Sequence, residues 1–195
     1  MVDEYYNVYR IKSHSYDHGC GFIYGKYFIT AGHVISDSKR PYIETQNGKI
    51  DLDNPVFFSS AKEDYAYDLA IFKLPTDIMS PFHLSEKIPA IGDNLSNYHI
   101  RQLIVEDGHF DYTPVDCHVE VIKPFMRNYF SILTSPNIYA GSSGSPVLNA
   151  NMVMGIIVAG NNKGNDTPKS TDYPINYCLV LSSKAILKIF ETLDS

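Results

Sequence analysis

The sequence predicts an all-β fold closed by one C-terminal helix, and three observations support this. Apolar runs are short, numerous and evenly spaced along the 195 residues, with turn-forming residues between them. The fifteen tyrosines and ten phenylalanines favour strands. Helical periodicity is hardly found outside residues 182–195. Such a pattern is typical of β-barrels or β-sandwiches.

The apolar runs divide into two groups. Strands are expected over residues 5–11, 20–24, 27–30, 41–45, 55–59 and 69–74, and again over 94–101, 115–122, 129–134, 145–148, 153–159 and 177–181. The breaker-rich stretch between the groups contains Pro75, Pro81, Pro89 and Gly92. We therefore expect an N-terminal domain over residues 1–82, a linker over 83–93 and a C-terminal domain over 94–181.

The last element, over residues 182–195, is expected to be an amphipathic helix. Ser182 or Ser183 can cap its first turn. The apolar positions then fall on one face of the helix, namely Ile186, Ile189, Phe190 and Leu193. We expect this face to pack against the rest of the protein.

Composition and charge narrow the classes of partner. The net charge is −6 and the sequence pI is about 5.6, with no long run of Lys or Arg, so we expect neither nucleic acid nor an anionic membrane as a partner. No segment has the roughly 18 apolar residues that cross a bilayer. Three widely spaced cysteines in apolar stretches, Cys20, Cys117 and Cys178, indicate buried free thiols. These features, with no secretory signal in the first residues, predict a cytoplasmic protein.

Three local segments carry residue types suited to nucleophilic catalysis. His33 follows an apolar strand and two small residues in FITAGHV, Asp68 precedes an alternating strand in YDLAIFKL, and Ser143 lies between two glycines in GSSGSPV. A serine hydroxyl attacks a peptide bond at neutral pH only when an imidazole takes its proton and a carboxylate fixes the tautomer of that imidazole. The turn around Ser143 can also aim the N–H groups of Gly141 and Ser143 at one point, as an oxyanion hole.

The segments TAGHV, DLAIFKL and GSSGSPV, in this order, resemble the three signature blocks of the chymotrypsin/trypsin-like serine proteases. The resemblance implies two six-stranded antiparallel β-barrels, the first carrying His33 and Asp68 and the second Ser143. It also implies an endopeptidase that cleaves protein or peptide substrates through an acyl-enzyme intermediate. The nearest likeness is to glutamyl-endopeptidase-like bacterial enzymes and viral 3C-like proteases, and a viral origin would place the protein in the host cytoplasm. Ser142 replaces the aspartate that digestive enzymes use in zymogen activation, so we expect no activation of that kind.

The same resemblance implies where a substrate binds. Val158, Ala159 and Gly160 correspond to the strand that pairs with the substrate main chain. Asn137, Ile138 and Ile157 correspond to the wall of the primary pocket. Ile157 stands where glutamyl and 3C-like relatives have a histidine, and an aliphatic wall leaves a polar side chain unpaired. A hydrophobic residue is therefore expected on the N-terminal side of the cleaved bond.

Other interpretations remain open at the sequence level. Asp64 and Glu63 are rivals of Asp68, and Ser143 can belong to an ordinary Gly-Ser turn. His14, His18 and Cys20 make a poor zinc pattern because no fourth ligand is near, and we expect no metal or cofactor.

The remaining histidines, His83, His99, His109 and His118, are expected on the surface. The alternative function is a catalytically silent module that binds an extended peptide or a protein partner in the same groove. The oligomeric state is left open.

Overall fold

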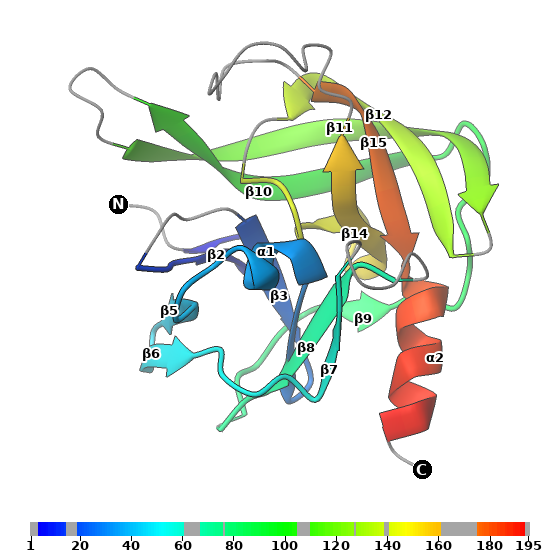
Figure 1. Ribbon diagram of the computed structural model, residues 1–195. Coiled ribbons are helices and arrows are strands. Elements are labelled where there is room, and N and C mark those ends of the chain that lie inside the picture. Colours follow the sequence, from blue (N-terminus) through cyan, green and yellow to red (C-terminus); the bar gives the residue numbers. More distant parts are fainter. Residues whose placement is uncertain are drawn as a thin grey trace.

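The computed structural model describes residues 4–14, 19–60, 67–75, 77–104, 110–126, 128–138, 141–160 and 175–193. Figure 1 shows one sheet from the first part of the chain (blue to cyan) and another from the later part (green to orange). The C-terminal helix (red) runs beside the first sheet. No helix among the described residues is long and apolar enough to cross a membrane.

The N-terminal sheet has six strands, and its pairing is antiparallel throughout. Short hairpin turns connect β2 to β1 and β4 to β3, so these neighbours in sequence are also neighbours in space. A separate hairpin approaches the sheet through a single bridge between Lys12 and Tyr42. In sheet order the strands are β1 (Glu4–Tyr5), β2 (Val8–Ile11), β3 (Gly19–Tyr24), β4 (Tyr27–Thr30), β8 (Leu69–Lys73) and β7 (Phe57–Ser59), and the hairpin is β5 (Tyr42–Thr45) with β6 (Gly48–Asp51).

The C-terminal sheet closes on itself, because β13 pairs with β10 on one side and with β14 on the other. Six strands form the ring, and β9, at the start of the expected linker, adds to β14 in parallel. Long strands that bend at register shifts allow this closure. The strands are β10 (Asn94–Ile104), β11 (Phe110–Met126), β12 (Tyr129–Ile138), β15 (Ile175–Ser182), β14 (Met152–Gly160) and β13 (Pro146–Asn149), with β9 (His83–Leu84) outside the ring.

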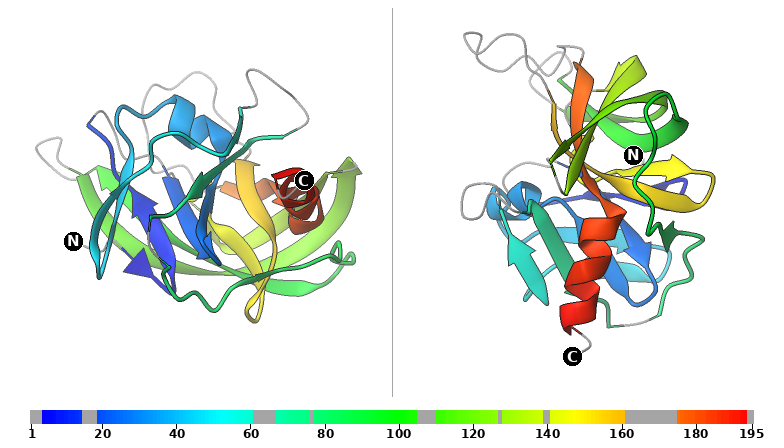
Figure 2. Two further views of the ribbon diagram at one scale, coloured as in Figure 1. Left: turned by 90° about the horizontal axis from the view of Figure 1, so that it is seen from below. Right: turned by 90° about the vertical axis from the view of Figure 1, so that its right-hand side faces the viewer.

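The predicted C-terminal helix forms as α2 (Ser183–Leu193). Ile186, Ile189 and Phe190 are buried, and each such burial stabilises the fold by about 1.5–3 kcal/mol. The Phe190 ring lies 5.6 Å from the Tyr24 ring and 5.0 Å from the Tyr27 ring, measured between centroids. The helix that follows the last strand of the C-terminal barrel therefore packs against the N-terminal sheet through Phe190, and the right-hand view of Figure 2 shows it (red) beside that half.

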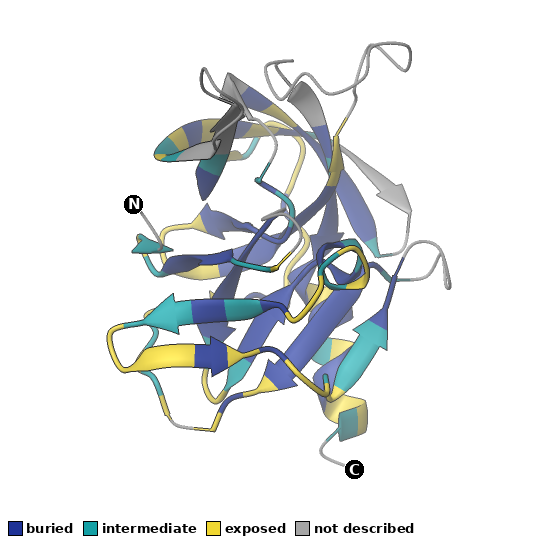
Figure 3. Cartoon of the chain, turned by 60° about the vertical axis from the view of Figure 1, so that its left-hand side comes forward, coloured by how far each residue is buried: buried dark blue, intermediate teal, exposed yellow. Residues whose placement is uncertain are grey.

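Buried residues, dark blue in Figure 3, gather in the strands at the centre of the molecule. One apolar cluster fills the N-terminal sheet and extends to Leu148, Val153 and Ile156 of the second half. A second cluster fills the C-terminal barrel and includes Cys117 and Cys178. The shared cluster fixes the two halves against each other, which matters because the candidate site draws residues from both. The all-β two-barrel fold with a C-terminal helix is confirmed.

Candidate active site

His33 lies on a short helix that the sequence pattern did not predict. The helix is α1 (Gly32–Ser36), and its N-cap residue Ala31 supplies no side-chain hydrogen bond. Five residues without a cap give no periodicity signal, so tertiary contacts determine this helix. A Cβ at Gly32 would lie 2.0 Å from the Ser59 carbonyl oxygen, so only glycine lets α1 approach the edge of the sheet this closely.

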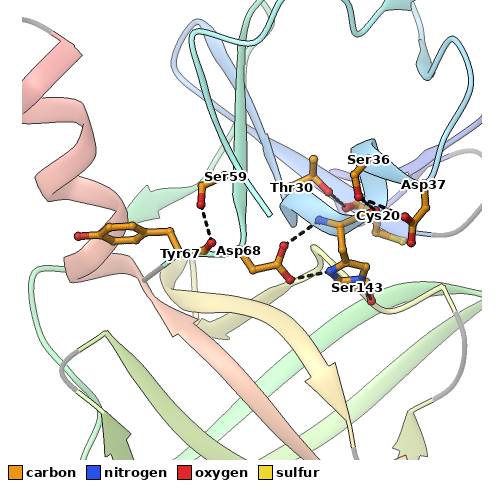
Figure 4. Close-up of polar contacts among 9 residues, drawn as sticks. Cys20, Thr30, Ser36, Asp37, Ser59, Tyr67, Asp68 and Ser143 are labelled. Atoms are coloured by element: carbon orange, nitrogen blue, oxygen red, sulfur yellow. Dashed lines mark hydrogen bonds and ion pairs between the residues drawn. The ribbon is translucent and has the colours of Figure 1, made fainter. Parts of the chain in front are cut away.

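Asp68 precedes β8 and is 4% exposed. Its Oδ1 accepts the His33 backbone N–H at 2.7 Å, and its Oδ2 lies 2.6 Å from His33 Nδ1 (Figure 4). These two hydrogen bonds compensate the buried carboxylate and hold the imidazole ring in one orientation. The rival carboxylates Glu63 and Asp64 lie outside the described residues.

Ser143 lies in the turn between β12 and β13, and its Oγ is 3.0 Å from His33 Nε2. The turn is anchored to the N-terminal sheet, because Cys20 N–H donates to the Ser143 carbonyl at 2.8 Å. Gly144, with φ +82°, passes so close to this sheet that a Cβ there would lie 2.2 Å from the Cys20 carbonyl oxygen. A glycine beside the serine is therefore required both by backbone conformation and by space.

The three side chains thus form a continuous chain of hydrogen bonds across the junction of the two halves. The carboxylate of Asp68 is an acceptor, so His33 Nδ1 carries the proton and the Nε2 lone pair faces the Ser143 hydroxyl. The His33 side chain is 28% exposed, so one side of the ring remains accessible to solvent. In chemical terms, this arrangement can remove the proton from Ser143 Oγ while the resulting imidazolium lies beside a negative charge.

The backbone of the turn is the second feature of the site. The N–H of Gly144 donates to the Ile157 carbonyl at 2.7 Å, and that of Ser145 to the Ser142 carbonyl at 3.0 Å. Within the described part of the chain, no hydrogen bond engages the N–H groups of Gly141 and Ser143. These two groups are the predicted oxyanion donors.

The predicted substrate-binding residues fall into three groups. Ala159 and Gly160 are exposed, and they pair with β15 on one side only, with no further strand beside them among the described residues. Val158 and Ile157 are 6% and 2% exposed, and Ile157 packs in the core of the C-terminal barrel. Asn137 and Ile138 end β12, and their side chains lie outside the described part of the structure. The roles of all six residues stay predictions.

Several other sequence-based expectations can be compared with the structure. No cluster of three potential metal ligands occurs in the described residues, which exclude His18. His83 and His118 are exposed as expected, and His109 lies outside the described residues. All three cysteines are buried, which confirms the placement inferred from their apolar surroundings. Burial raises the pKa of each thiol to about 12.

The expected surface position of His99 is wrong. Its exposed fraction is 0%, and its Nδ1 lies 2.9 Å from Asn97 Oδ1. Burial, with the positive charge of Arg101 as a second cause, lowers the pKa of His99 to about 3, so the ring is neutral at pH 7. Sequence reasoning missed Asn97 and His99 because polar residues at alternate positions of a strand normally indicate a solvated face.

Comparison with known proteins identifies the fold of this chain through its similarity to solved structures. No protein-family model matches the sequence, and no curated protein matches it. Among solved structures, neuropsin, a serine protease expressed in the limbic system of mouse brain, is 13% identical, with a TM-score of 0.70, over 97% of this chain and 94% of that one. A serine endoprotease from Yersinia pestis is 20% identical, with a TM-score of 0.66, over 99% of this chain and 68% of that one.

The same fold also occurs in a protein whose name refers to heparin binding and not to proteolysis. Human heparin binding protein is 10% identical, with a TM-score of 0.69, over 97% of this chain and 92% of that one. The chain therefore has the chymotrypsin/trypsin-like serine protease fold.

Proposed function

We propose that the protein is a serine endopeptidase that cleaves peptide bonds through an acyl-enzyme intermediate. The single observation that carries this proposal is the chain of hydrogen bonds from Asp68 through His33 to Ser143. The three residues lie 35 and 110 positions apart in sequence, as counted from His33, so only the fold brings them together. A turn that needed no chemistry has no reason to place its hydroxyl on a carboxylate-bound imidazole.

In the first half of the reaction, Ser143 Oγ attacks the carbonyl carbon of the scissile bond while His33 Nε2 takes the hydroxyl proton. The carbonyl electron pair moves to its oxygen, and the N–H groups of Gly141 and Ser143 stabilise that oxyanion by about 3–4 kcal/mol per donor. His33 then gives its proton to the leaving nitrogen as the C–N bond breaks. Asp68 stays ionised throughout and stabilises the imidazolium.

In the second half, water attacks the acyl carbon and His33 takes a proton from it. The bond between the acyl carbon and Ser143 Oγ then breaks, and His33 returns the proton to Oγ. No cofactor enters either half. The exposed edge at Ala159–Gly160 suits an extended peptide that adds to β14 as a further strand. We propose a cytoplasmic protease of limited proteolysis with a preference for an apolar residue before the cut.

The test is cleavage of a peptide library, with new termini identified by mass spectrometry. Wild-type protein should cut the peptides at bonds that have an apolar residue on their N-terminal side. Ser143→Ala should cleave the same peptides at least about 1000-fold more slowly. Ser80→Ala is the matched control, because the Ser80 hydroxyl donates to the Ile23 carbonyl and, among the described residues, makes no hydrogen bond to His33, Asp68 or Ser143. Equal cleavage by wild type and Ser143→Ala would overturn the proposal. Cuts mainly after Glu or Gln would overturn only the apolar preference.

The second candidate is a module that binds an extended peptide without cutting it. Two observations support this binding function. The strand edge at Ala159–Gly160 has a partner strand on one side only among the described residues, and the same fold occurs in human heparin binding protein. Titration of fluorescent library peptides against Ser143→Ala measures binding alone. Binding by both forms with no cleavage by the wild type would establish this function instead.

A further inference from the structure

A buried chain of polar side chains lies behind the nucleophile turn and takes no part in the proposed reaction steps. Asn97 and His99 project from β10, and Ser145 directly precedes β13; all three are 0% exposed. Asn97 Nδ2 lies 2.9 Å from Ser145 Oγ and 2.8 Å from the Pro146 carbonyl oxygen. Ser145 Oγ lies 2.6 Å from the Ser142 carbonyl oxygen. The chain therefore runs from His99 to the residue before the nucleophile.

The direction of every hydrogen bond in this chain is determined by its two ends. The carbonyl oxygens of Ser142 and Pro146 can only accept, so Ser145 Oγ donates to the first and Asn97 Nδ2 donates to the second. Asn97 Nδ2 then also donates to Ser145 Oγ, and Asn97 Oδ1 is left as an acceptor. The proton between Asn97 and His99 consequently belongs to His99 Nδ1. One consistent set of donors leads from the imidazole to the Ser142 carbonyl.

The last acceptor of this chain belongs to the peptide unit that presents the Ser143 N–H. The Ser142 carbonyl accepts from both the hydroxyl and the backbone N–H of Ser145, at 2.6 and 3.0 Å. A planar peptide held by two bonds at its oxygen cannot rotate freely, so the N–H at its other end points in a fixed direction. Hydrogen bonds accepted by a carbonyl also polarise its peptide and strengthen the N–H as a donor.

The burial of His99 destabilises the folded state, so its presence at this position is not explained by stability. Its Nε2 is buried and has no hydrogen-bond partner among the described residues. An unpaired buried acceptor of this kind destabilises the folded state, a cost that an apolar ring at the same position would avoid. What the imidazole supplies is the Nδ1–H that Asn97 Oδ1 accepts, so that the amide oxygen is paired inside the protein while Nδ2 donates to Pro146 and Ser145.

We infer that Asn97 and Ser145, with His99 behind them, are positioning residues that fix the Ser142–Ser143 peptide so that its N–H serves as an oxyanion donor. This inference rests on the proposed endopeptidase function. None of the three side chains contacts the reacting atoms. Their effect is on the transition state, where negative charge develops on the substrate oxygen, and not on binding of the substrate.

The inference is tested with a fluorophosphonate probe. Ser143 Oγ bonds to phosphorus, fluoride leaves, and the hydroxyl proton passes to His33, while the phosphoryl oxygen needs the same donors as a substrate oxyanion. The rate of adduct formation, followed by intact mass, separates the maximal rate kinact from the apparent affinity KI. Ser145→Ala should lower kinact roughly 10-fold and leave KI within about 2-fold.

Two further measurements separate positioning from general packing. Ser183→Ala is the matched control, because Ser183 is also 0% exposed and its hydroxyl donates to the Val153 carbonyl at 2.5 Å, away from the turn; its kinact should match the wild type. Asn97→Ala should lower kinact in the wild type but add little in the Ser145→Ala background, because both changes break the same chain. If Asn97→Ala does not fold, the two serine variants decide.

The outcomes distinguish this inference from the proposed function. Rapid labelling of Ser145→Ala at the wild-type kinact overturns the inference and leaves the endopeptidase proposal intact. An equal loss in Ser183→Ala, or additive losses in the double variant, overturns it as well. A folded wild-type protein that is not labelled at all overturns both.

Discussion

Replacement of Asp68 by asparagine tests the tautomer of His33, on which proton removal from Ser143 depends. The carboxylate accepts two hydrogen bonds, from the His33 backbone N–H and from His33 Nδ1. Asparagine has one acceptor and one donor in place of two acceptors. Its oxygen must face the backbone N–H, because the opposite orientation sets two donors against each other inside the protein, at a cost of about 1–3 kcal/mol.

With the oxygen so placed, the amide NH₂ of the variant donates to His33 Nδ1. The ring proton then moves to Nε2, which faces Ser143 Oγ as a donor and can no longer accept the hydroxyl proton. The variant also loses the negative charge that stabilises the imidazolium, an interaction on the order of 4 kcal/mol at an effective dielectric constant of 20. We expect the two effects to lower the rate about 10⁴-fold, which corresponds to about 5 kcal/mol of activation free energy.

The assay is the rate of fluorophosphonate labelling by intact mass, with thermal unfolding to show that the variant is folded. Asp77→Asn is the matched control, since Asp77 is an exposed aspartate of the same half and should label like the wild type. A folded Asp68→Asn protein that retains more than about a tenth of the wild-type rate would refute the assignment of the tautomer.

Three further predictions concern stability and reactivity. Gly144→Ala should lower the free energy of unfolding by several kcal/mol more than Gly92→Ala in urea titrations, because both residues have φ near +80° but only Gly144 lacks space for a Cβ; equal losses would show that the contact with Cys20 is not limiting. Between pH 7 and pH 5 the wild type should lose about 2 kcal/mol more stability than His99→Gln. The sign follows because the pKa of His99 is depressed in the folded state, so the unfolded chain takes up the proton first as the pH falls below 6.5; parallel pH profiles would contradict it. The three buried thiols should resist iodoacetamide at pH 7.5 in the folded protein and react fully in denaturant, and fast reaction of the folded protein would place a thiol at the surface.

Sequence patterns predicted where strands occur, but they did not predict how long the strands are. β11 runs from Phe110 to Met126, although the sequence pattern supports only residues 115–122. Pro114 and Pro124 argue against a strand on local grounds, yet Pro114 pairs with Ile100 and Pro124 lies at a register shift. Pro124 is tolerated because the strand bends at that register shift, and Pro114 because the pairs of β11 with β12 among the described residues begin only at His118, which leaves one side of Pro114 without a partner strand. Bends of this kind follow from closure of the sheet and leave no local signal.

The candidate site shows a similar division between local and tertiary information. The residues His33, Asp68 and Ser143 could be found from sequence because each lies in a short segment with a recognisable local requirement for small or apolar neighbours. Helix α1 could not be found, since its five residues are held by the close approach of Gly32 to Ser59. Asn97 could not be found either, because its two acceptors come from a turn that is distant in sequence.

The central claim is that one hydroxyl, that of Ser143, is activated by the fold. Its most direct test is to treat the folded protein with a fluorophosphonate and locate the adduct by peptide mapping. We predict one adduct per chain, on Ser143, and none on Ser143→Ala or on denatured wild-type protein. A folded protein that takes up no probe, or that carries the adduct on another residue, would contradict the account.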